Sequence, residues 1–139
     1  MSPDSLADEV WQSMAAVVAE NRDSWKRAVV EQTGLPFSRF RILRRLEAKA
    51  MTAKELAAAT AMDAPAATVA INDLEDRGLV VRQPDPDNRR CKLVSVTDAG
   101  AALMRGIRQI DDPAPPVFAT LDADELATLR DLLSRLRRH

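Results

Sequence analysis

The sequence predicts a mainly α-helical fold that contains one small β-hairpin, and residues 52–97 are the centre of that prediction. Three observations lead to it. Two short helical patterns are separated by a turn, two strand patterns joined by a basic turn follow directly, and amphipathic helical patterns flank both sides. A helix, a turn, a second helix and a hairpin form a winged helix-turn-helix, and 139 residues with 46% hydrophobic composition suit one such domain.

Residues 5–33 are expected to form one continuous helix, because their apolar residues share a stripe. Such a helix would be about 40 Å long, too long for one small domain to cover, so part of the stripe is expected to meet a second subunit. Gly34 and Pro36 end this helix, and Ser38 is the expected N-cap of the next one. The next helix is expected to bury Phe40, Leu43 and Leu46 and to expose Arg39, Arg41, Arg44 and Arg45.

The two central helices are marked by capping residues. Thr52 and Glu55 have the spacing of a capping box at the start of the first helix. Asp63 is the expected N-cap of the second helix, where Pro65 is tolerated because N–H groups of the first turn lack helical partners. The buried face of this helix is expected to consist of Ala67, Ala70, Ile71 and Leu74. Gly78 ends it as a C′ glycine.

The β-hairpin is expected to pair residues 79–81 with residues 91–97 across a turn at residues 84–88. The returning strand is expected to place Leu93, Ser95 and Thr97 on one face and Lys92, Val94 and Val96 on the other.

Two further helices are expected after the hairpin. Thr97 caps the first, whose apolar residues are Leu103, Met104, Ile107 and Ile110. Three prolines among residues 113–116 interrupt this pattern, since proline is not accommodated inside a helix. Asp122 starts the last helix, whose apolar stripe consists of Leu126, Leu129, Leu132, Leu133 and Leu136.

The distribution of charge is more informative than the net charge of −1. Residues 36–97 carry a net charge of +3, whereas residues 1–35 carry −3 and residues 98–139 carry −1. A mildly basic centre between acidic ends is typical of a nucleic-acid-binding core whose termini serve another purpose.

Catalysis, cofactors and metal binding are not expected. The only histidine is His139, the four glycines are scattered, and no phosphate loop, nucleophile elbow or metal-ligand cluster can be assembled. A single cysteine, Cys91, excludes an intramolecular disulfide framework. Residues 1–10 lack a signal-peptide pattern and no stretch approaches the roughly 20 apolar residues of a membrane span, so a cytoplasmic protein without membrane contact is expected.

Two segments resemble the MarR (multiple antibiotic resistance regulator) family. The run Asp87-Asn88-Arg89, followed by Leu93 to Thr97, is similar to the wing of that family, and LEDRGLVVR from Leu74 to Arg82 resembles the end of its recognition helix. The flanking helices also fall where the family has them, so the resemblance covers the whole chain. The prolines of residues 113–116 depart from the longer unbroken helix of the family, and a break or kink is expected there.

The resemblance implies a homodimeric transcriptional regulator, a repressor, that binds a pseudo-palindromic operator in double-stranded DNA. It implies that residues 1–35 and 98–139 form dimerisation helices and that residues 36–97 form the DNA-binding lobe. The alternative from another class is a protein-interaction module on a winged-helix frame that has lost DNA binding. Salt-dependent binding to duplex DNA separates the two, because only phosphate contacts release counterions.

The residues expected to contact DNA are Arg89, Arg90, Lys92, Asp87, Thr68, Asn72, Ala66, Val69, Ser38, Arg39 and Lys54. In the wing, the resemblance implies that Asp87 orients Arg89 through a charge-assisted bond and that Arg89 enters a groove. In the recognition helix, Asn72 can pair with adenine, whereas Val69 stands where the family commonly has an arginine. The alternative for the recognition-helix residues is that they are ordinary exposed side chains without a DNA contact. The alternative for the arginines of residues 39–45 is that they form a solvated face and do not contact phosphate.

The family often releases DNA when a small aromatic molecule binds between the dimer helices and the DNA-binding lobe. By resemblance, such an effector would contact Trp11, Met14 and Trp25, for which core packing is the alternative. Cys91 follows two arginines, an environment that can activate a thiol. Since the chain has no second cysteine to resolve an oxidised thiol, a plain strand residue is favoured over a redox sensor.

Overall fold

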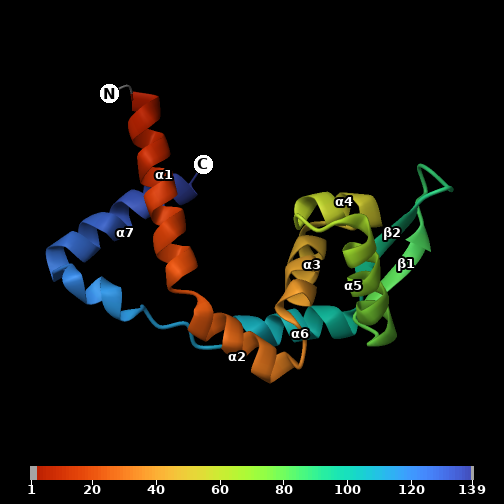
Figure 1. Ribbon diagram of the computed structural model, residues 1–139. Helices are drawn as coiled ribbons and strands as arrows, with labels where there is room; N and C mark the ends of the chain where they lie inside the picture. Colours follow the sequence, from red (N-terminus) through yellow and green to blue (C-terminus); the bar gives the residue numbers. More distant parts are fainter. Residues whose placement is uncertain (1–2, 139) are drawn as a thin grey trace.

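The computed structural model describes residues 3–138, and the single histidine, His139, lies outside them. Its elements are α1 (Pro3–Glu20), α2 (Asp23–Thr33), α3 (Phe37–Ala48), α4 (Ala53–Ala59), α5 (Ala64–Asp76), β1 (Val80–Pro84), β2 (Lys92–Val96), α6 (Asp98–Arg108), the 3-10 helix η1 (Pro116–Thr120) and α7 (Ala123–Arg137). In Figure 1, α3, α4, α5 and the hairpin form a lobe, α2 and α6 run along its base, and α1 and α7 form an arm at one end. The predicted class, mainly helical with one small hairpin, is confirmed.

The core of the lobe is built from α3, α4, α5 and the hairpin, and α2 and α6 close it from below. Its buried hydrophobic cluster consists of Val29, Leu35, Phe40, Ile42, Leu43, Leu46, Leu56, Ala70, Ile71, Leu74, Val80, Val94, Met104 and Ile107. Val29 and Ile107 lie outside residues 36–97, so the packed core extends beyond the segment predicted to be the lobe. The predicted buried face of α5 is confirmed, because Ala67, Ala70, Ile71 and Leu74 are all inaccessible to solvent.

The capping residues predicted for the two central helices are confirmed. The Thr52 hydroxyl accepts a hydrogen bond from the Glu55 N–H at 3.1 Å, and the Glu55 carboxylate accepts one from the Thr52 N–H at 3.2 Å. The Asp63 carboxylate accepts a hydrogen bond from the Ala66 N–H at 2.7 Å. Gly78 follows α5 with a φ of +75°, a left-handed conformation that favours glycine.

The hairpin pairs β1 with β2 in antiparallel register, with Val80 opposite Val96 and Pro84 opposite Lys92. Val94 points into the core, and its backbone exchanges hydrogen bonds of 3.2 and 2.7 Å with Met51, which adds a short third partner to the sheet. β1 extends further than predicted, because Pro84 still pairs at the end of the strand, a position where its missing N–H is tolerated.

The single long helix predicted for residues 5–33 is wrong, because α1 ends at Glu20 and α2 starts at Asp23. The Asn21 N–H donates to the Val18 carbonyl at 3.2 Å, and the Asn21 side-chain amide donates to the Val17 carbonyl at 2.7 Å. A short polar side chain thus satisfies the helix end and lets the chain turn. Hydrophobic periodicity continues across this point, which is why the stripe alone did not predict the break.

The prediction that Ser38 caps α3 is also wrong. The helix starts at Phe37, and its N-cap is Pro36, which makes no side-chain capping bond. Pro36 has ψ of 144°, an extended conformation from which the chain enters the helix. Ser38 therefore lies in the first turn, where its hydroxyl accepts a hydrogen bond from Arg39 Nη1 at 3.1 Å.

The chain after the hairpin follows the predicted order of helix, break and helix. The Thr97 hydroxyl accepts a hydrogen bond from the Gly100 N–H at 3.1 Å and caps α6. α6 ends at Arg108, before the prolines, and Asp122 forms a capping box with Glu125 at the start of α7. Among residues 3–138, no helix is both long enough and apolar enough to span a membrane.

Candidate nucleic-acid interface

The outward face of α5 presents small and uncharged side chains. Ala66, Thr68, Val69 and Asn72 are all exposed, and Val69 has 60% of its surface accessible. The helix contains no lysine or arginine, so it cannot supply much attraction for phosphate. What it can offer is apolar contact with thymine methyl groups from Val69 or Ala66 and hydrogen bonds to base edges from Thr68 and Asn72.

The wing holds its shape through hydrogen bonds within the turn. The Asp85 N–H donates to the Cys91 carbonyl at 3.0 Å, the Cys91 N–H donates to the Asn88 carbonyl at 2.9 Å, and the Arg90 N–H donates to Asn88 Oδ1 at 3.2 Å. These contacts use backbone atoms and the Asn88 amide, and so leave the basic side chains of the turn uncommitted.

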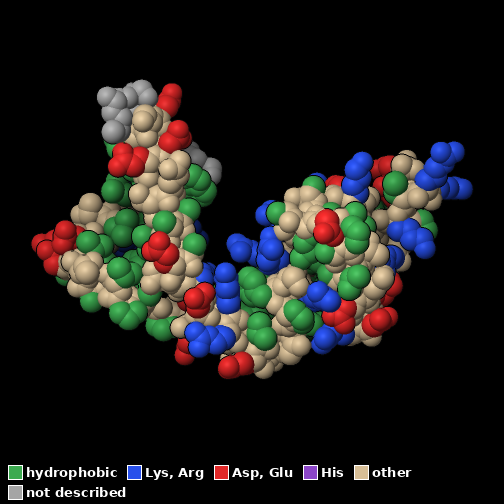
Figure 2. All heavy atoms as spheres, viewed as in Figure 1, with side chains coloured by type: hydrophobic (Ala, Val, Ile, Leu, Met, Phe, Trp, Pro, Cys, Tyr) green, Lys and Arg blue, Asp and Glu red, His purple; other side chains and the backbone are tan. Residues whose placement is uncertain are grey.

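Three basic side chains of the wing are available to a partner. Arg89, Arg90 and Lys92 are exposed, and none of them forms an ion pair within residues 3–138. Figure 2 shows Lys and Arg side chains gathered at this tip of the molecule. The wing, which is the turn between β1 and β2, therefore concentrates positive charge at one end of the lobe.

The bond expected between Asp87 and Arg89 is absent from the structure described for residues 3–138. The Asp87 N–H instead donates to Asp85 Oδ1 at 2.9 Å, and both Asp87 and Arg89 are exposed. A solvated pair of this kind gains little from contact, since water screens it and two side chains lose rotamer freedom. The expected orienting role of Asp87 is therefore corrected for this structure.

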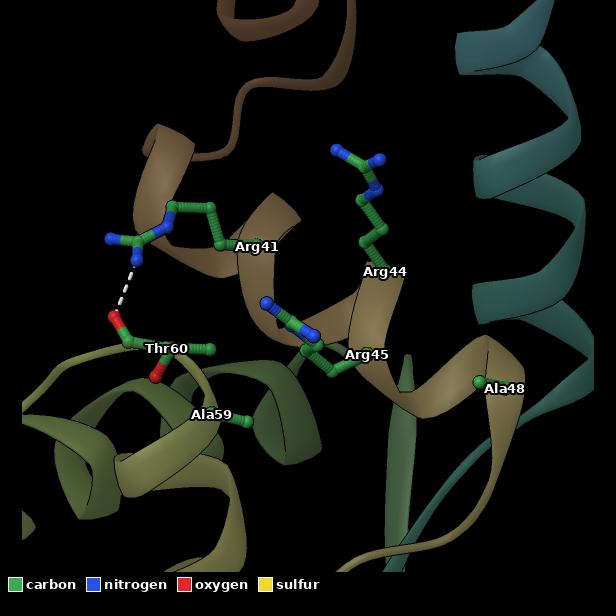
Figure 3. Close-up of a pocket in the computed structure, with 6 residues that line it drawn as sticks. All are labelled: Arg41, Arg44, Arg45, Ala48, Ala59 and Thr60. Atoms are coloured by element: carbon green, nitrogen blue, oxygen red, sulfur yellow. Dashed lines mark hydrogen bonds between the residues drawn. The ribbon is translucent and has the colours of Figure 1, made fainter. Parts of the chain in front are cut away.

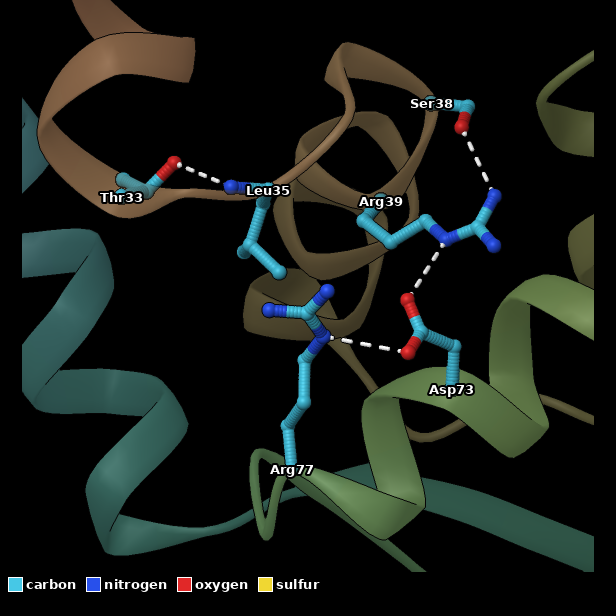
Figure 4. Close-up of polar contacts among 6 residues, drawn as sticks. All are labelled: Thr33, Leu35, Ser38, Arg39, Asp73 and Arg77. Atoms are coloured by element: carbon cyan, nitrogen blue, oxygen red, sulfur yellow. Dashed lines mark hydrogen bonds and ion pairs between the residues drawn. The ribbon is translucent and has the colours of Figure 1, made fainter.

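Asp73 links the recognition helix to α3 (Figure 4). One carboxylate oxygen of Asp73 lies 3.0 Å from Arg39 Nε, and the other lies 3.1 Å from Arg77 Nε. The hydrogen bonds from Arg39 and then Arg77 hold the pKa of the Asp73 carboxyl below its ordinary value. Asp73 thus stays charged, and two cations balance that charge, so it adds less negative potential to α5 than its sequence position suggests.

The same contacts place the candidates Ser38 and Arg39. Arg39 is half-buried and uses Nε for Asp73 and Nη1 for Ser38, so its guanidinium is largely committed within the protein. Lys54, in the first turn of α4, is exposed and makes no ion pair within the described part of the chain. Of the flanking candidates, Lys54 is the one with its charge free for phosphate.

Arg82 was not among the predicted site residues, although it lies directly beside them. It sits on β1, two positions from the buried Val80, and its side chain contacts two residues of α5, Asn72 and Glu75. The alternation of strand side chains contained the necessary signal, because residues two apart share a face and Val80 faces α5. The contact with Asn72, ten residues away in sequence, required the packing of β1 against α5.

Three arginines of α3 line a hollow of about 320 Å³ together with Ala48, Ala59 and Thr60 (Figure 3). Arg41 donates to the Thr60 carbonyl at the end of α4, whereas Arg44 points away from that carbonyl. Arg41, Arg44 and Arg45 are exposed as predicted, whereas Arg39, which was predicted to be exposed with them, is half-buried. Both Arg41 and Arg44 also border a second, more apolar hollow on the side of α1.

The three effector candidates line this second hollow, which has a volume of about 490 Å³. Trp11 is exposed, Met14 is half-buried, and Trp25 packs edge-on against Phe37 and Phe40 with ring centroids 6.0 and 5.4 Å away. Trp25 therefore contributes to the core as well as to the hollow. The structure brings the three side chains together between the arm and the lobe.

The capped helix pair, the exposed face of α5 and the basic hairpin after it define a winged helix-turn-helix protein. The model of the MarR family matches residues 33–90. The chain is 28% identical over 123 residues to the multiple antibiotic resistance protein MarR of Escherichia coli (strain K12), which covers 86% of this chain and 85% of that protein. The chain is therefore similar to the MarR family of transcriptional regulators, with the family model matched over residues 33–90.

Solved structures of MarR are also similar to this chain. Apo wild-type MarR from E. coli has a TM-score of 0.73 and 26% identity, with 90% of this chain and 95% of that chain covered. A mutant MarR from E. coli complexed with operator DNA has a TM-score of 0.65 and 27% identity, with 90% of this chain and 91% of that chain covered. The similarity therefore includes the arm as well as the lobe.

Proposed function

We propose that this chain is a sequence-specific DNA-binding regulator that acts as a homodimer on a pseudo-palindromic operator and represses transcription. The observation that carries the proposal is the exposed face of α5 beside a wing whose Arg89, Arg90 and Lys92 are free of ion pairs within residues 3–138. A recognition helix and a basic hairpin of this kind suit a major groove and the adjacent backbone or minor groove. The similarity to a MarR mutant complexed with operator DNA supports the same conclusion.

The proposal divides the work between the two elements. Ala66, Thr68, Val69 and Asn72 of α5 read base edges, because they are exposed and uncharged. Arg89, Arg90 and Lys92 of the wing supply attraction for the backbone, with Lys54 as an additional phosphate contact. Ser38 and Arg39 support the interface from behind, because Arg39 is tied to Asp73 on α5.

The second partner in this proposal is another copy of the chain. No residue of α1 or α7 for which burial is described is buried within one chain, and Leu6, Val10, Leu132 and Leu136 are among the exposed large hydrophobic residues. A hollow of about 380 Å³ between the two helices is lined mainly by apolar side chains of α1 and α7. Burial of these faces against a second copy would remove them from water, the dominant favourable term in association. Residues 1–35 and 98–139 are thus assigned to dimerisation, although α2 and α6 also serve the core of the lobe.

A small aromatic anion is the effector that we propose for the hollow around Trp11, Met14 and Trp25. Aromatic side chains favour a flat apolar ligand, and the lining includes Lys26, Arg41 and Arg44, whereas Arg22 is paired with Asp112. A ligand there would lie between the arm and the lobe, where it can bias their relative position and so alter the spacing of two recognition helices.

The test of DNA binding is the affinity of the intact chain for operator-containing duplexes from its source genome, measured by fluorescence anisotropy over a series of salt concentrations. The logarithm of affinity is expected to fall linearly with the logarithm of salt concentration, because wing contacts release counterions. The alternative, a protein-interaction module, is favoured by one specific observation, the absence of lysine and arginine from α5. Duplex binding that is undetectable at low salt would support that alternative.

A further inference from the structure

Arg82 is held against the recognition helix by two residues that lie one helical turn apart. Arg82 Nη2 donates to the amide oxygen of Asn72 at 2.7 Å, and Nη1 donates to Glu75 Oε1 at 2.8 Å. The Arg82 side chain is 21% exposed, whereas Asn72 lies on the exposed face of α5. A largely buried cation therefore contacts the side chain that is best suited to reach a base edge.

This contact determines how the Asn72 amide is oriented. A guanidinium has five N–H donors and no acceptor, so only the oxygen of the amide can face Arg82. The Nδ2 group then lies on the other side, and within residues 3–138 it makes no hydrogen bond. To an approaching molecule, the two side chains together present N–H donors, and the charge of Arg82 is balanced by Glu75.

We propose that Asn72, oriented by Arg82, selects a base with acceptors on its major-groove edge, guanine first, instead of the adenine that an unrestrained asparagine pairs with. The inference rests on the proposed function and names the base that this site prefers. Guanine presents two acceptors, N7 and O6, whereas adenine presents the N7 acceptor beside the N6 amino donor. Pairing with adenine requires Asn72 Oδ1 to accept from N6, but that oxygen already accepts a hydrogen bond from Arg82. Asn72 is the contact residue, and Arg82 is a positioning residue.

The test is selection of bound duplexes from a library with randomised half-sites, followed by sequencing. The wild type is expected to prefer guanine over adenine by about tenfold at one position per half-site. Asn72→Ala should lose the preference at that position alone. Arg82→Met frees the amide and should raise adenine at least to the level of guanine, whereas Arg82→Lys keeps a cation with donors only and should retain the guanine preference.

An exposed substitution keeps the test independent of the stability of the Arg82 variants. Asn72→Asp replaces two donors by acceptors and should shift the same position from guanine to cytosine, whose N4 amino group donates. A change in base preference at one position is not expected from a residue that only supports the fold, because lost stability weakens binding to every sequence alike.

Three outcomes would overturn the inference while the proposed function stands: a wild type that selects adenine at the position controlled by Asn72, a wild type with no preference there, or an Arg82→Met profile identical to that of the wild type. All three require measurable binding to duplex DNA. Undetectable or salt-independent binding by the wild type would instead overturn the proposed function itself, and the two failures are thereby distinguished.

Discussion

Arg39 Nε lies 3.0 Å from a carboxylate oxygen of Asp73, and this ion pair joins the first turn of α3 to the recognition helix. Arg77 contacts the second oxygen of the same carboxylate from within the end of α5. Asp73 thus contacts Arg39, 34 residues earlier in the sequence, and Arg77, four residues later. The pair connects α5 to α3, so it is expected to contribute to the stability of the lobe.

Asp73→Asn is expected to lower the free energy of unfolding at neutral pH by about 0.5–1 kcal/mol, because the ion pairs are partly exposed and screened. The pKa of Asp73 is depressed by its hydrogen bonds to Arg39 and Arg77, so this contribution is present above its ordinary value of 3.8 and is lost as the pH falls through the lower, folded-state pKa. Urea denaturation at fixed protein concentration should therefore show a steeper loss of stability below pH 3.8 for the wild type than for Asp73→Asn.

The matched control is Asp131→Asn on α7. Asp131 is 69% exposed, and within residues 3–138 its ion pair is with its neighbour Arg130, so its substitution should change stability by no more than about 0.5 kcal/mol. Equal acid sensitivity of the wild type and Asp73→Asn would contradict a native-state role for the Asp73 ion pairs.

Substitution by alanine at the two glycines of α6 should change the stability of the protein in opposite directions. A Cβ atom at Gly100 would lie 2.2 Å from the Leu79 carbonyl oxygen and 2.6 Å from Val96 Cγ2, so Gly100→Ala forces the helix away from the hairpin. We expect a destabilisation of about 1–3 kcal/mol, the usual cost of overpacking. Thermal unfolding at fixed protein concentration would measure it.

Gly106→Ala is the control in the same helix. A Cβ there meets no other atom within 4 Å, and Gly106 is helical, so alanine should stabilise the protein by about 0.4–1 kcal/mol through the entropy of the unfolded chain. If both substitutions destabilise the protein to the same extent, the approach of Gly100 to Leu79 does not account for the cost at Gly100.

Arg89→Ala should weaken DNA binding by roughly 1–3 kcal/mol per subunit, because α5 lacks a cation and the wing must provide the attraction. Loss of one phosphate contact per wing should also flatten the dependence of log affinity on log salt by about one unit per wing. Anisotropy titrations across salt concentrations measure both quantities.

Arg130→Ala removes the same charge from α7, where the side chain is 73% exposed and far in sequence from the wing. Its salt slope should remain that of the wild type. An Arg89→Ala slope that also matches the wild type would show that the wing makes no phosphate contact through Arg89.

The dimer prediction is tested on the exposed stripe of α7. Leu132 and Leu136 have 50% and 64% of their surface exposed within one chain, so replacement of both by lysine should leave the fold intact and convert the dimer into a 15.3 kDa monomer. Sedimentation velocity at micromolar concentration measures the species. Removal of residues 122–139 should have a stronger effect, with aggregation or unfolding of the exposed remainder.

Ser134→Lys is the control, because helical spacing puts residue 134 on the side of α7 away from the leucine stripe. It should sediment as the wild-type dimer. A wild type that sediments only as a 15.3 kDa species would exclude the dimer and the paired half-sites together.

Much of the architecture could be predicted from the sequence, because its signals connect residues that are near one another in the chain. The caps at Thr52, Asp63 and Thr97 each involve an N–H three residues further on, so the sequence spacing alone specifies the contact. The prolines after α6 act in the same local way, since each restricts its own backbone and that of its neighbour. These predictions needed no knowledge of how the helices pack.

Other features depended on the tertiary structure. The break at Asn21 lies within an unbroken apolar stripe, and the Arg22 side chain that follows it pairs with Asp112, 90 residues away. The orientation of Asn72 follows from Arg82 on a different element, and the charge of Asp73 is balanced by Arg39 from another helix. Sequence periodicity places a side chain on a face of its own helix or strand, but the identity of the group opposite is decided when the elements pack. Electrostatic and hydrogen-bonding partners at the site are therefore properties of the folded chain.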